Sequence, residues 1–129
     1  KMNKLIIDAA KDKIFLMIIN NETNYSIKHE NTKTNYEKLT LLIRDFLKMQ
    51  NLDLKKISQI YVNNGPGSFA GIRNSLTIVK AFHLANKTDY YCFSFDDLGK
   101  KIDIKYENIP KLCEKLKVEK NLINPIYLG

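Results

Sequence analysis

The sequence has few of the residues that bind metals or form disulfide bonds. It contains two cysteines, Cys92 and Cys113, and two histidines, His29 and His83. The histidines are far apart and belong to no H-x-x-x-H or C-x-x-C pattern, so we expect no metal site. Cys92 lies in an apolar run typical of a strand, and Cys113 lies on a helix-like face. We therefore expect two reduced thiols, as is usual in a cytoplasmic protein.

Long hydrophobic runs are also missing. No apolar stretch approaches the roughly 18 residues that a membrane span needs. The chain does not open with a charged and then apolar leader, so we expect a cytoplasmic protein with no membrane partner. The 129 residues include 21 Lys and Arg against 14 Asp and Glu, a net charge of +7. No basic stripe interleaved with aromatic residues stands out, so a solvated surface is favoured, with an acidic partner or RNA as the alternative.

The first third of the chain predicts three strands. Lys4–Asp8 is short and apolar, Ile14–Ile19 is a continuous apolar run, and Tyr25–Glu30 alternates between apolar and polar residues. The connections are short enough for hairpins, so these segments predict an antiparallel meander.

Two helices then alternate with two strands. Residues 34–37 fit a capping box, with Thr34 as the N-cap and Glu37 reaching back to it. Apolar residues then recur at spacings of three and four, up to a helix end near Asn51. A strand at Ile57–Asn63, a helix at Ser68–Asn86 and a strand at Asp89–Ser94 follow. Right-handed crossovers would make this part of the sheet parallel.

The resulting order, β-β-β-α-β-α-β, is typical of the ribonuclease H-like half-domain found in actin, Hsp70 and the sugar kinases. We therefore predict an α/β fold with a mixed sheet of this type. Such an analogy concerns the fold and carries no function by itself. After it, we expect a short helix at Phe95–Leu98, a strand at Ile102–Tyr106 and a helix at Ile109–Leu116 with Pro110 in its first turn. The apolar end around Ile126 is expected to dock on the body.

The stretch NNGPGSFAGIR, residues 63–73, raises the question of phosphate binding. It fails the P-loop pattern, because Gly65 and Gly71 are six apart and Ile72 follows. It has the spelling of a dinucleotide fingerprint, with Asp89 near the distance of the expected acidic residue. However, that fingerprint follows the first strand of a parallel unit, and here a meander comes first. The amides at the helix start could still hold an anion.

A structural interpretation of the same stretch is stronger. Gly67 permits a positive φ, Pro66 rigidifies the turn and Ser68 is a good N-cap. Arg73 lies in the first helical turn, where the helix dipole disfavours a cation. We therefore expect Arg73 to face a carboxylate, a phosphate or a partner.

Acid–base constellations are poor. Asp8 ends the first strand, where actin-fold kinases keep an aspartate that handles phosphate or metal. It is followed here by Ala9 and Ala10, which offer neither the glycine nor the hydroxyl groups that would wrap a phosphate. Asp96 and Asp97 are interpreted as charges at a helix N-terminus rather than as a catalytic pair.

These motifs together resemble the TsaB (YeaZ) family. The segment GPGSFAGIR opens a helix that ends in VKAFHLA, as the family's glycine motif does. LIIDAA, NYEKLTLLIRDFL, LDLKKISQIYV and YYCFSFDDL resemble the segments around that motif, and NPIYLG resembles the family's C-terminus. The chain departs from the family at Ala9 and Ala10, which replace hydroxyl residues, at Asn35, usually His, and at Ala70, usually Thr. The stretch after Leu98 is too short for the family's second lobe.

The resemblance implies a non-catalytic subunit for tRNA threonylcarbamoyladenosine synthesis. It would pair through its two helices with a TsaD-type subunit, which holds ATP, a metal and the active site. Residues 1–98 would form the actin-type lobe, and residues 99–129 a short remnant of the second lobe docked on it. Further expected partners are a TsaE-type ATPase, tRNA through the complex and, when the chain is alone, a second copy.

Two sets of site residues follow from the resemblance. The partner interface is expected at Leu41, Met49, Ile72, Arg73, Leu76, Val79, Lys80 and His83. We expect no cofactor of the chain's own, but ATP or ADP at the interface, near Gly65, Gly67, Ser68 and Arg73. The alternatives are a stand-alone ATP-dependent transferase, a protease as the family was once labelled, or a small nucleotide- or RNA-binding module.

Overall fold

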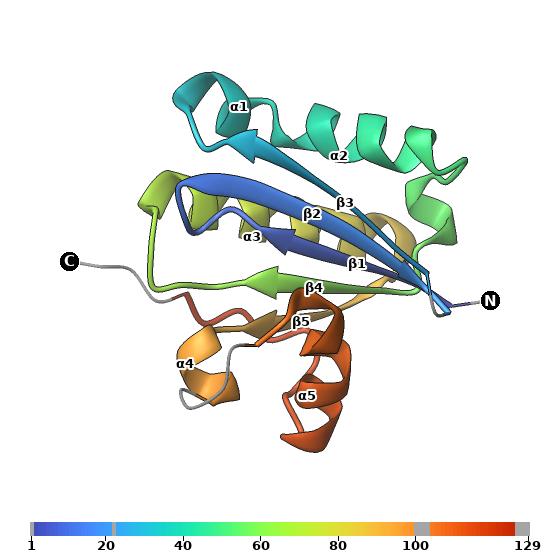
Figure 1. The fold of residues 1–129 in the computed structure, drawn as a ribbon, viewed down its shortest axis with the longest axis vertical. Coiled ribbons are helices and arrows are strands. Elements are labelled where there is room, and N and C mark those ends of the chain that lie inside the picture. The colour runs from blue at the N-terminus through green and yellow to red at the C-terminus, as the bar shows by residue number, and fades with distance from the viewer. Residues whose placement is uncertain (1, 22, 100–103, 126–129) are drawn as a thin grey trace.

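The computed structural model describes residues 2–21, 23–99 and 104–125 of the chain. A five-stranded sheet runs through its centre in the order β3-β2-β1-β4-β5 (Figure 1). Its strands are β1 (Asn3–Asp8), β2 (Lys13–Asn20), β3 (Thr23–Glu30), β4 (Gln59–Asn63) and β5 (Asp89–Phe93). β1, β2 and β3 pair antiparallel, whereas β4 lies parallel to both β1 and β5. The predicted fold class, a mixed α/β sheet built as a meander and two crossovers, is therefore confirmed.

The apolar runs of β1 and β2 place them in the middle of the sheet. Side chains of a strand alternate between the two faces. Leu5 and Ile7 accordingly belong to one hydrophobic core, and Ile6 belongs to another on the opposite face. A strand that is apolar on both sides needs cover on both faces, which the helices and the C-terminal segment supply. β3 is exposed along its first half and alternates between half-buried and exposed residues along its second half, as an edge strand does.

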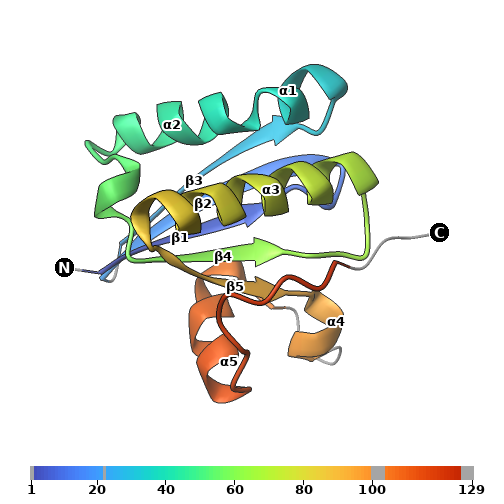
Figure 2. The same cartoon turned by 180° about the vertical axis from the view of Figure 1, so that it is seen from behind.

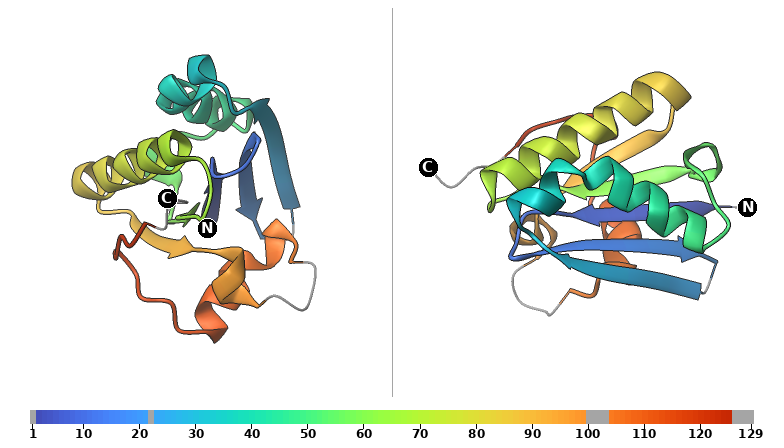
Figure 3. Two further views of the ribbon diagram at one scale, coloured as in Figure 1. Left: turned by 90° about the vertical axis from the view of Figure 1, so that its left-hand side faces the viewer. Right: turned by 90° about the horizontal axis from the view of Figure 1, so that it is seen from above.

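Helices cover one face of the sheet in a single layer. They are α1 (Lys33–Glu37), α2 (Leu39–Met49) and α3 (Phe69–Asn86) (Figure 2; Figure 3, right). The apolar stripe of α2, predicted from its spacing, is buried against β1 and β2. A short 3-10 turn, η1 (Leu54–Lys56), leads from α2 into β4.

The predicted start of the first helix is wrong. Thr32, not Thr34, is the N-cap, and its hydroxyl accepts from the amide of Asn35 at 3.3 Å. The helix also breaks at Lys38 between α1 and α2. At the break, Asn74 of α3 donates to the carbonyl of Tyr36 at 3.1 Å. In a continuous helix that carbonyl would accept from the amide four residues on. Asn74 thus satisfies the carbonyl that the interruption leaves unpaired.

The segment after β5 covers the second face of the sheet. It contains α4 (Phe95–Leu98), the 3-10 turn η2 (Tyr106–Asn108) and α5 (Ile109–Lys115) (Figure 3, left). Leu98, Ile109 and Cys113 pack there against the outward side chains of β1, β2, β4 and β5. The helices predicted at Phe95–Leu98 and Ile109–Leu116 are confirmed, with Pro110 in the first turn of α5.

The strand predicted at Ile102–Tyr106 is wrong where it can be checked. Residues 102 and 103 lie outside the described residues, and so do residues 126–129, including the apolar end expected to dock. Ile104 and Lys105 form no strand, and Tyr106 begins η2. Just before the undescribed end, the carbonyl of Asn124 accepts from Asn64 at 2.9 Å, so the chain lies against the body there.

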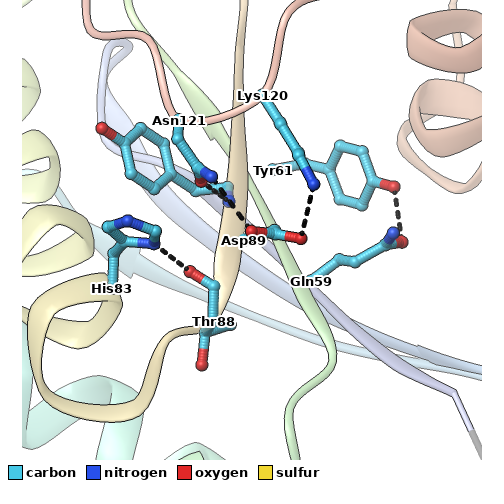
Figure 4. A network of polar contacts seen from close by, with 8 residues as sticks. Gln59, Tyr61, His83, Thr88, Asp89, Lys120 and Asn121 are labelled. Atoms are coloured by element: carbon cyan, nitrogen blue, oxygen red, sulfur yellow. Dashed lines mark hydrogen bonds and ion pairs between the residues drawn. The ribbon is translucent and has the colours of Figure 1, made fainter.

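A polar network fastens the C-terminal segment to the edge of β5 (Figure 4). Asn121 accepts from the amide of Tyr90 through Oδ1 at 2.9 Å, and its own amide donates to the carbonyl of Tyr90 at 2.7 Å. Its side-chain nitrogen donates to Asp89 at 3.0 Å, and Lys120 lies 3.5 Å from the same carboxylate. Asn121 has φ 62°, a conformation that asparagine tolerates better than most residues. The edge of β5 is therefore covered by the protein's own chain.

Candidate functional site

The glycine-rich turn connects β4 to α3. The hydroxyl of Ser68 accepts from the amide of Gly71 at 3.2 Å, which confirms Ser68 as the N-cap. At the other end of the turn, Asn63 accepts from the amide of Gly65 at 2.8 Å. The peptide bond between Gly65 and Pro66 is cis. The turn is thus tied to both the strand that it leaves and the helix that it starts.

The glycines serve close packing against the β1–β2 connection. A Cβ atom on Gly67 would lie 2.1 Å from the carbonyl oxygen of Ala10, and one on Gly71 would lie 1.9 Å from that of Ala9. Neither distance can be accommodated without moving backbone. The amide of Ser68 also donates to Ala10 at 2.8 Å. The start of α3 therefore rests directly on the hairpin turn that follows Asp8.

This packing reduces the number of hydrogen-bond donors that the turn could offer to a nucleotide. The amides of Gly65 and Ser68 already have partners within the chain. The hydroxyl of Ser68 accepts from Gly71 and keeps its own proton to donate. Arg73 is exposed, with its guanidinium 5.2 Å from the centre of the Phe69 ring. Of the four residues predicted to contact a nucleotide, the remaining donors are the side chain of Arg73, the hydroxyl of Ser68 and the amide of Gly67, which has no partner among the described residues.

Asp8 is fully buried, and a tyrosine from the C-terminal segment bonds to it. The hydroxyl of Tyr106 donates to Oδ2 of Asp8 at 2.5 Å, and the amide of Ala10 donates to Oδ1 at 3.0 Å. The Tyr106 ring stacks on Phe15 with centroids 4.0 Å apart and meets Phe95 edge-on at 5.5 Å. Burial, and next the charge of Asp8, raise the pKa of Tyr106, which keeps it a proton donor.

Tyr106 is a residue that sequence reasoning missed. Its position 98 residues from Asp8 gave no local signal of the contact. The hydroxyl of Tyr106 bonds to the carboxylate of Asp8. In an actin-type kinase, the aspartate at this position handles the phosphate or its metal ion. Among the described residues, no three His, Cys, Asp or Glu side chains gather where they could hold a metal ion. None of the described helices is both long and apolar enough to cross a membrane.

The structure divides the predicted interface residues into three groups, which are exposed, half-buried and buried. Leu41, Met49, Arg73 and Lys80 are exposed on the outer sides of α2 and α3. His83 is half-buried, its Nδ1 lying 2.9 Å from the carbonyl of Thr88 (Figure 4).

The remaining interface predictions, Ile72, Leu76 and Val79, are wrong. These residues face the sheet and are at most 4% exposed. They lie on the side of α3 that contributes to the core beneath it. A partner could therefore reach them only by disrupting the fold.

Two exposed apolar residues of α3 were missed, Phe69 at 53% and Leu84 at 71% exposed. Both lie outside the apolar stripe of the helix, at positions whose spacing puts them on the side of Arg73 and Lys80. That spacing was the signal that could have found them. The side of α3 away from the sheet thus carries apolar groups at both ends of the helix.

A groove of about 530 Å³ separates α1 and the start of α2 from the first half of α3. Its walls include Lys33 and Tyr36 on one side and Arg73 and Thr77 on the other. The groove lies beside the glycine-rich turn, where a nucleotide was expected.

A five-stranded mixed sheet with a meander, two crossovers and an aspartate at the end of β1 defines an actin-like lobe. The sequence matches the family model described as "TsaD: tRNA N6-adenosine threonylcarbamoyltransferase" over residues 19–94. The match spans more than half of the 129 residues, and the chain belongs to this family. No curated protein matches.

Solved structures share the fold, among them two that are related to YeaZ. "YeaZ from Pseudomonas aeruginosa" has a TM-score of 0.67 at 19% sequence identity, covering 73% of this chain and 44% of that one. The same figures hold for "Crystal structure of an uncharacterized protein with similarity to peptidase YEAZ from Pseudomonas aeruginosa". The chain thus spans less than half the length of these proteins. The predicted likeness to TsaB (YeaZ) is confirmed at the level of the fold.

Proposed function

We propose that this chain is a non-catalytic partner subunit in the synthesis of threonylcarbamoyladenosine on tRNA. It would bind and activate a TsaD-type subunit, which would transfer the threonylcarbamoyl group to adenosine. Membership of the family supports the reaction. The observation that carries the non-catalytic role is the state of Asp8, whose carboxylate is buried and bonded to Tyr106. A metal-bound phosphate would have to displace that tyrosine.

The surface proposed for the partner is the outer side of α2 and α3. Leu41 and Met49 on α2, and Phe69 and Leu84 on α3, expose apolar area although the core beneath them is complete. Exposed apolar area that gathers on one side of a molecule is typical of an interaction site. The same surface would serve self-association when the partner is absent.

ATP or ADP would lie between the two subunits rather than in a site of this chain alone. Arg73 and the hydroxyl of Ser68 support this part of the proposal, because both lie at the end of α3 that borders the groove. A TsaE-type ATPase and tRNA would join through the assembled complex. Residues 104–125 would stand in for a second lobe by covering the second face of the sheet.

The test is co-expression with the TsaD-type protein of the same organism, followed by size-exclusion chromatography with ATP. We expect one complex and tRNA modification only when both chains are present. Leu84→Asp should separate the chains, whereas Leu116→Asp, an exposed leucine following α5, should not. Two separate peaks with ATP present would contradict the proposal. Turnover by this chain alone would favour the enzyme alternative, and tight salt-dependent tRNA binding by it alone would favour an RNA-binding module.

A further inference from the structure

A second pocket lies at the end of the α2–α3 pair opposite the glycine-rich turn. Its volume is about 420 Å³, within the range of ligand-binding sites. The apolar lining comes from Leu47 of α2, Leu52 of the following loop and Leu54 of η1. Leu47 is buried and the other two leucines are half-buried, so the pocket has a firm apolar floor that still reaches the surface.

Positive charges surround this floor. Arg44 and Lys48 line one side, four residues apart on α2 and therefore one above the other. Lys55 lines the other side from η1. The ion pairs formed among the described residues are Lys13 with Glu30 and Lys120 with Asp89, so these three cations have no acidic partner within that part of the chain.

The acidic group in the lining does not neutralise this rim. Asp53 uses its Oδ1 to accept from the amide of Lys55 at 3.0 Å, as the cap of η1. Three cations against one carboxylate leave the rim positive. An anionic ligand would therefore gain from all three cations, although their exposure to solvent screens each contribution.

From these features we infer that the pocket binds an acidic peptide segment that carries one apolar anchor side chain. The leucine floor suits an aliphatic or aromatic anchor. Cations on two sides suit several carboxylates along a chain better than a single one. RNA fits less well, because the lining contains no aromatic ring on which a base could stack.

The neighbouring surface suits an extended chain. Leu52 and Lys55 also line a more polar hollow of about 640 Å³, which includes Asn3. Asn3 is 6% exposed, and its Oδ1 has no hydrogen-bond partner among the described residues. A peptide that leaves the apolar pocket in this direction brings backbone N–H groups. The side-chain oxygen of Asn3 can accept a hydrogen bond from such a group.

This inference does not rest on the proposed function. The pocket shares no lining residue with the groove beside the glycine-rich turn. Peptide binding is measured on this chain alone, whereas the proposed function is tested by assembly with a TsaD-type subunit. Either can fail while the other stands.

The experiment measures fluorescence anisotropy of a labelled peptide of six glutamates with a central leucine. We expect a Kd of about 10–100 µM at low salt. The double variant Arg44→Glu, Lys48→Glu should bind at least tenfold more weakly. The matched control is Lys111→Glu, Lys115→Glu, an exposed pair with the same spacing on α5, which should change the Kd by less than about twofold. Circular dichroism checks that both variants fold.

Three results would overturn the inference. One is no binding, or binding that Arg44→Glu, Lys48→Glu leaves unchanged. Another is an equal loss in the α5 control, which would mean that net charge alone attracts the peptide. The third is equal affinity of the pocket for a control ligand and for the probe. The control ligands are a peptide of glutamates without the leucine and an oligouridylate. The inference is supported if both control ligands bind more weakly than the probe and if Arg44→Glu, Lys48→Glu weakens binding of the probe more than the α5 control does.

Discussion

The hydroxyl of Tyr106 donates to the carboxylate of Asp8 at 2.5 Å, across 98 residues of sequence. Tyr106→Phe keeps the ring stacked on Phe15 but removes this donor, leaving the amide of Ala10 as the remaining bond described to the buried carboxylate. We expect a loss of about 1–3 kcal/mol in the free energy of unfolding, measured with urea. Tyr25→Phe, on the exposed strand β3, is the control and should change little. Equal stability of both variants would show that the bond contributes nothing net.

Alkaline conditions should destabilise the protein. Burial raises the pKa of the Cys113 thiol from 9.0 to about 11, and it raises the pKa of Tyr61 above its usual 10.0. Groups whose pKa is raised by folding contribute stability that is complete below the unfolded-state pKa and is lost as pH rises through the folded-state value. The urea midpoint should therefore hold to about pH 8.5 and fall from about pH 9 to 11. Cys113→Ala should lower the urea midpoint at neutral pH but make its decrease at alkaline pH less steep. An equally steep decrease in the variant would contradict the assignment of this pH dependence to Cys113.

Gly71→Ala should destabilise the fold although alanine favours a helix. The added Cβ would lie 1.9 Å from the carbonyl oxygen of Ala9, so the backbone of α3 or of the hairpin must move. Overpacking of this kind costs about 1–3 kcal/mol. Ala85→Gly, at an exposed position of the same helix, measures the effect of helix propensity without packing, which is about 1 kcal/mol in favour of alanine. Thermal unfolding of the two variants separates the effects, and a stabilised Gly71→Ala would contradict the close packing.

Two substitutions on α3 should have opposite kinds of effect. Val79 is fully buried, so Val79→Asp places a charge in the core and should unfold the chain. Leu84 is 71% exposed, so Leu84→Asp should keep its circular dichroism spectrum and change only assembly. A folded Val79→Asp would show that the orientation of α3 is different from the one described.

Asn121→Ala should loosen the C-terminal segment. The variant removes the side-chain bonds to Tyr90 and Asp89 and places alanine at a positive φ. Because the bond from Asn121 is the main cause that lowers the pKa of Asp89, the wild type should lose this contribution as pH falls through the folded-state pKa. Hydrogen exchange at β5 measures the effect, and Asn121→Gly, which keeps the backbone conformation, should be less affected. Unchanged protection in Asn121→Ala would contradict the role of the network.

The sequence predicted the arrangement of the sheet because its signals are local. The apolar runs of β1 and β2 and the stripe of α2 follow directly from periodicity. The contact of Tyr106 with Asp8 could not be predicted, because no pattern links residues so far apart. The direction of α3 was misjudged at Val79 because a helix that is apolar on several sides does not show which side meets the sheet. The glycines were correctly assigned to a turn, but their fit against Ala9 depends on atoms that only the folded chain brings together.

The fit of Gly71 against Ala9 also bears on the order in which the molecule folds. The antiparallel strands β1, β2 and β3 pair residues that are close in the chain. Lys4 of β1 pairs with Gln59 of β4, and β2, β3, α1 and α2 lie between these two residues in the sequence. Pairing between distant segments carries the larger entropy of loop closure and is slow. We expect the contact that joins the hairpin turn to the start of α3 to form after this slow step, because α3 begins beyond β4 in the chain. Loosening it should therefore speed unfolding while leaving the rate of folding nearly unchanged.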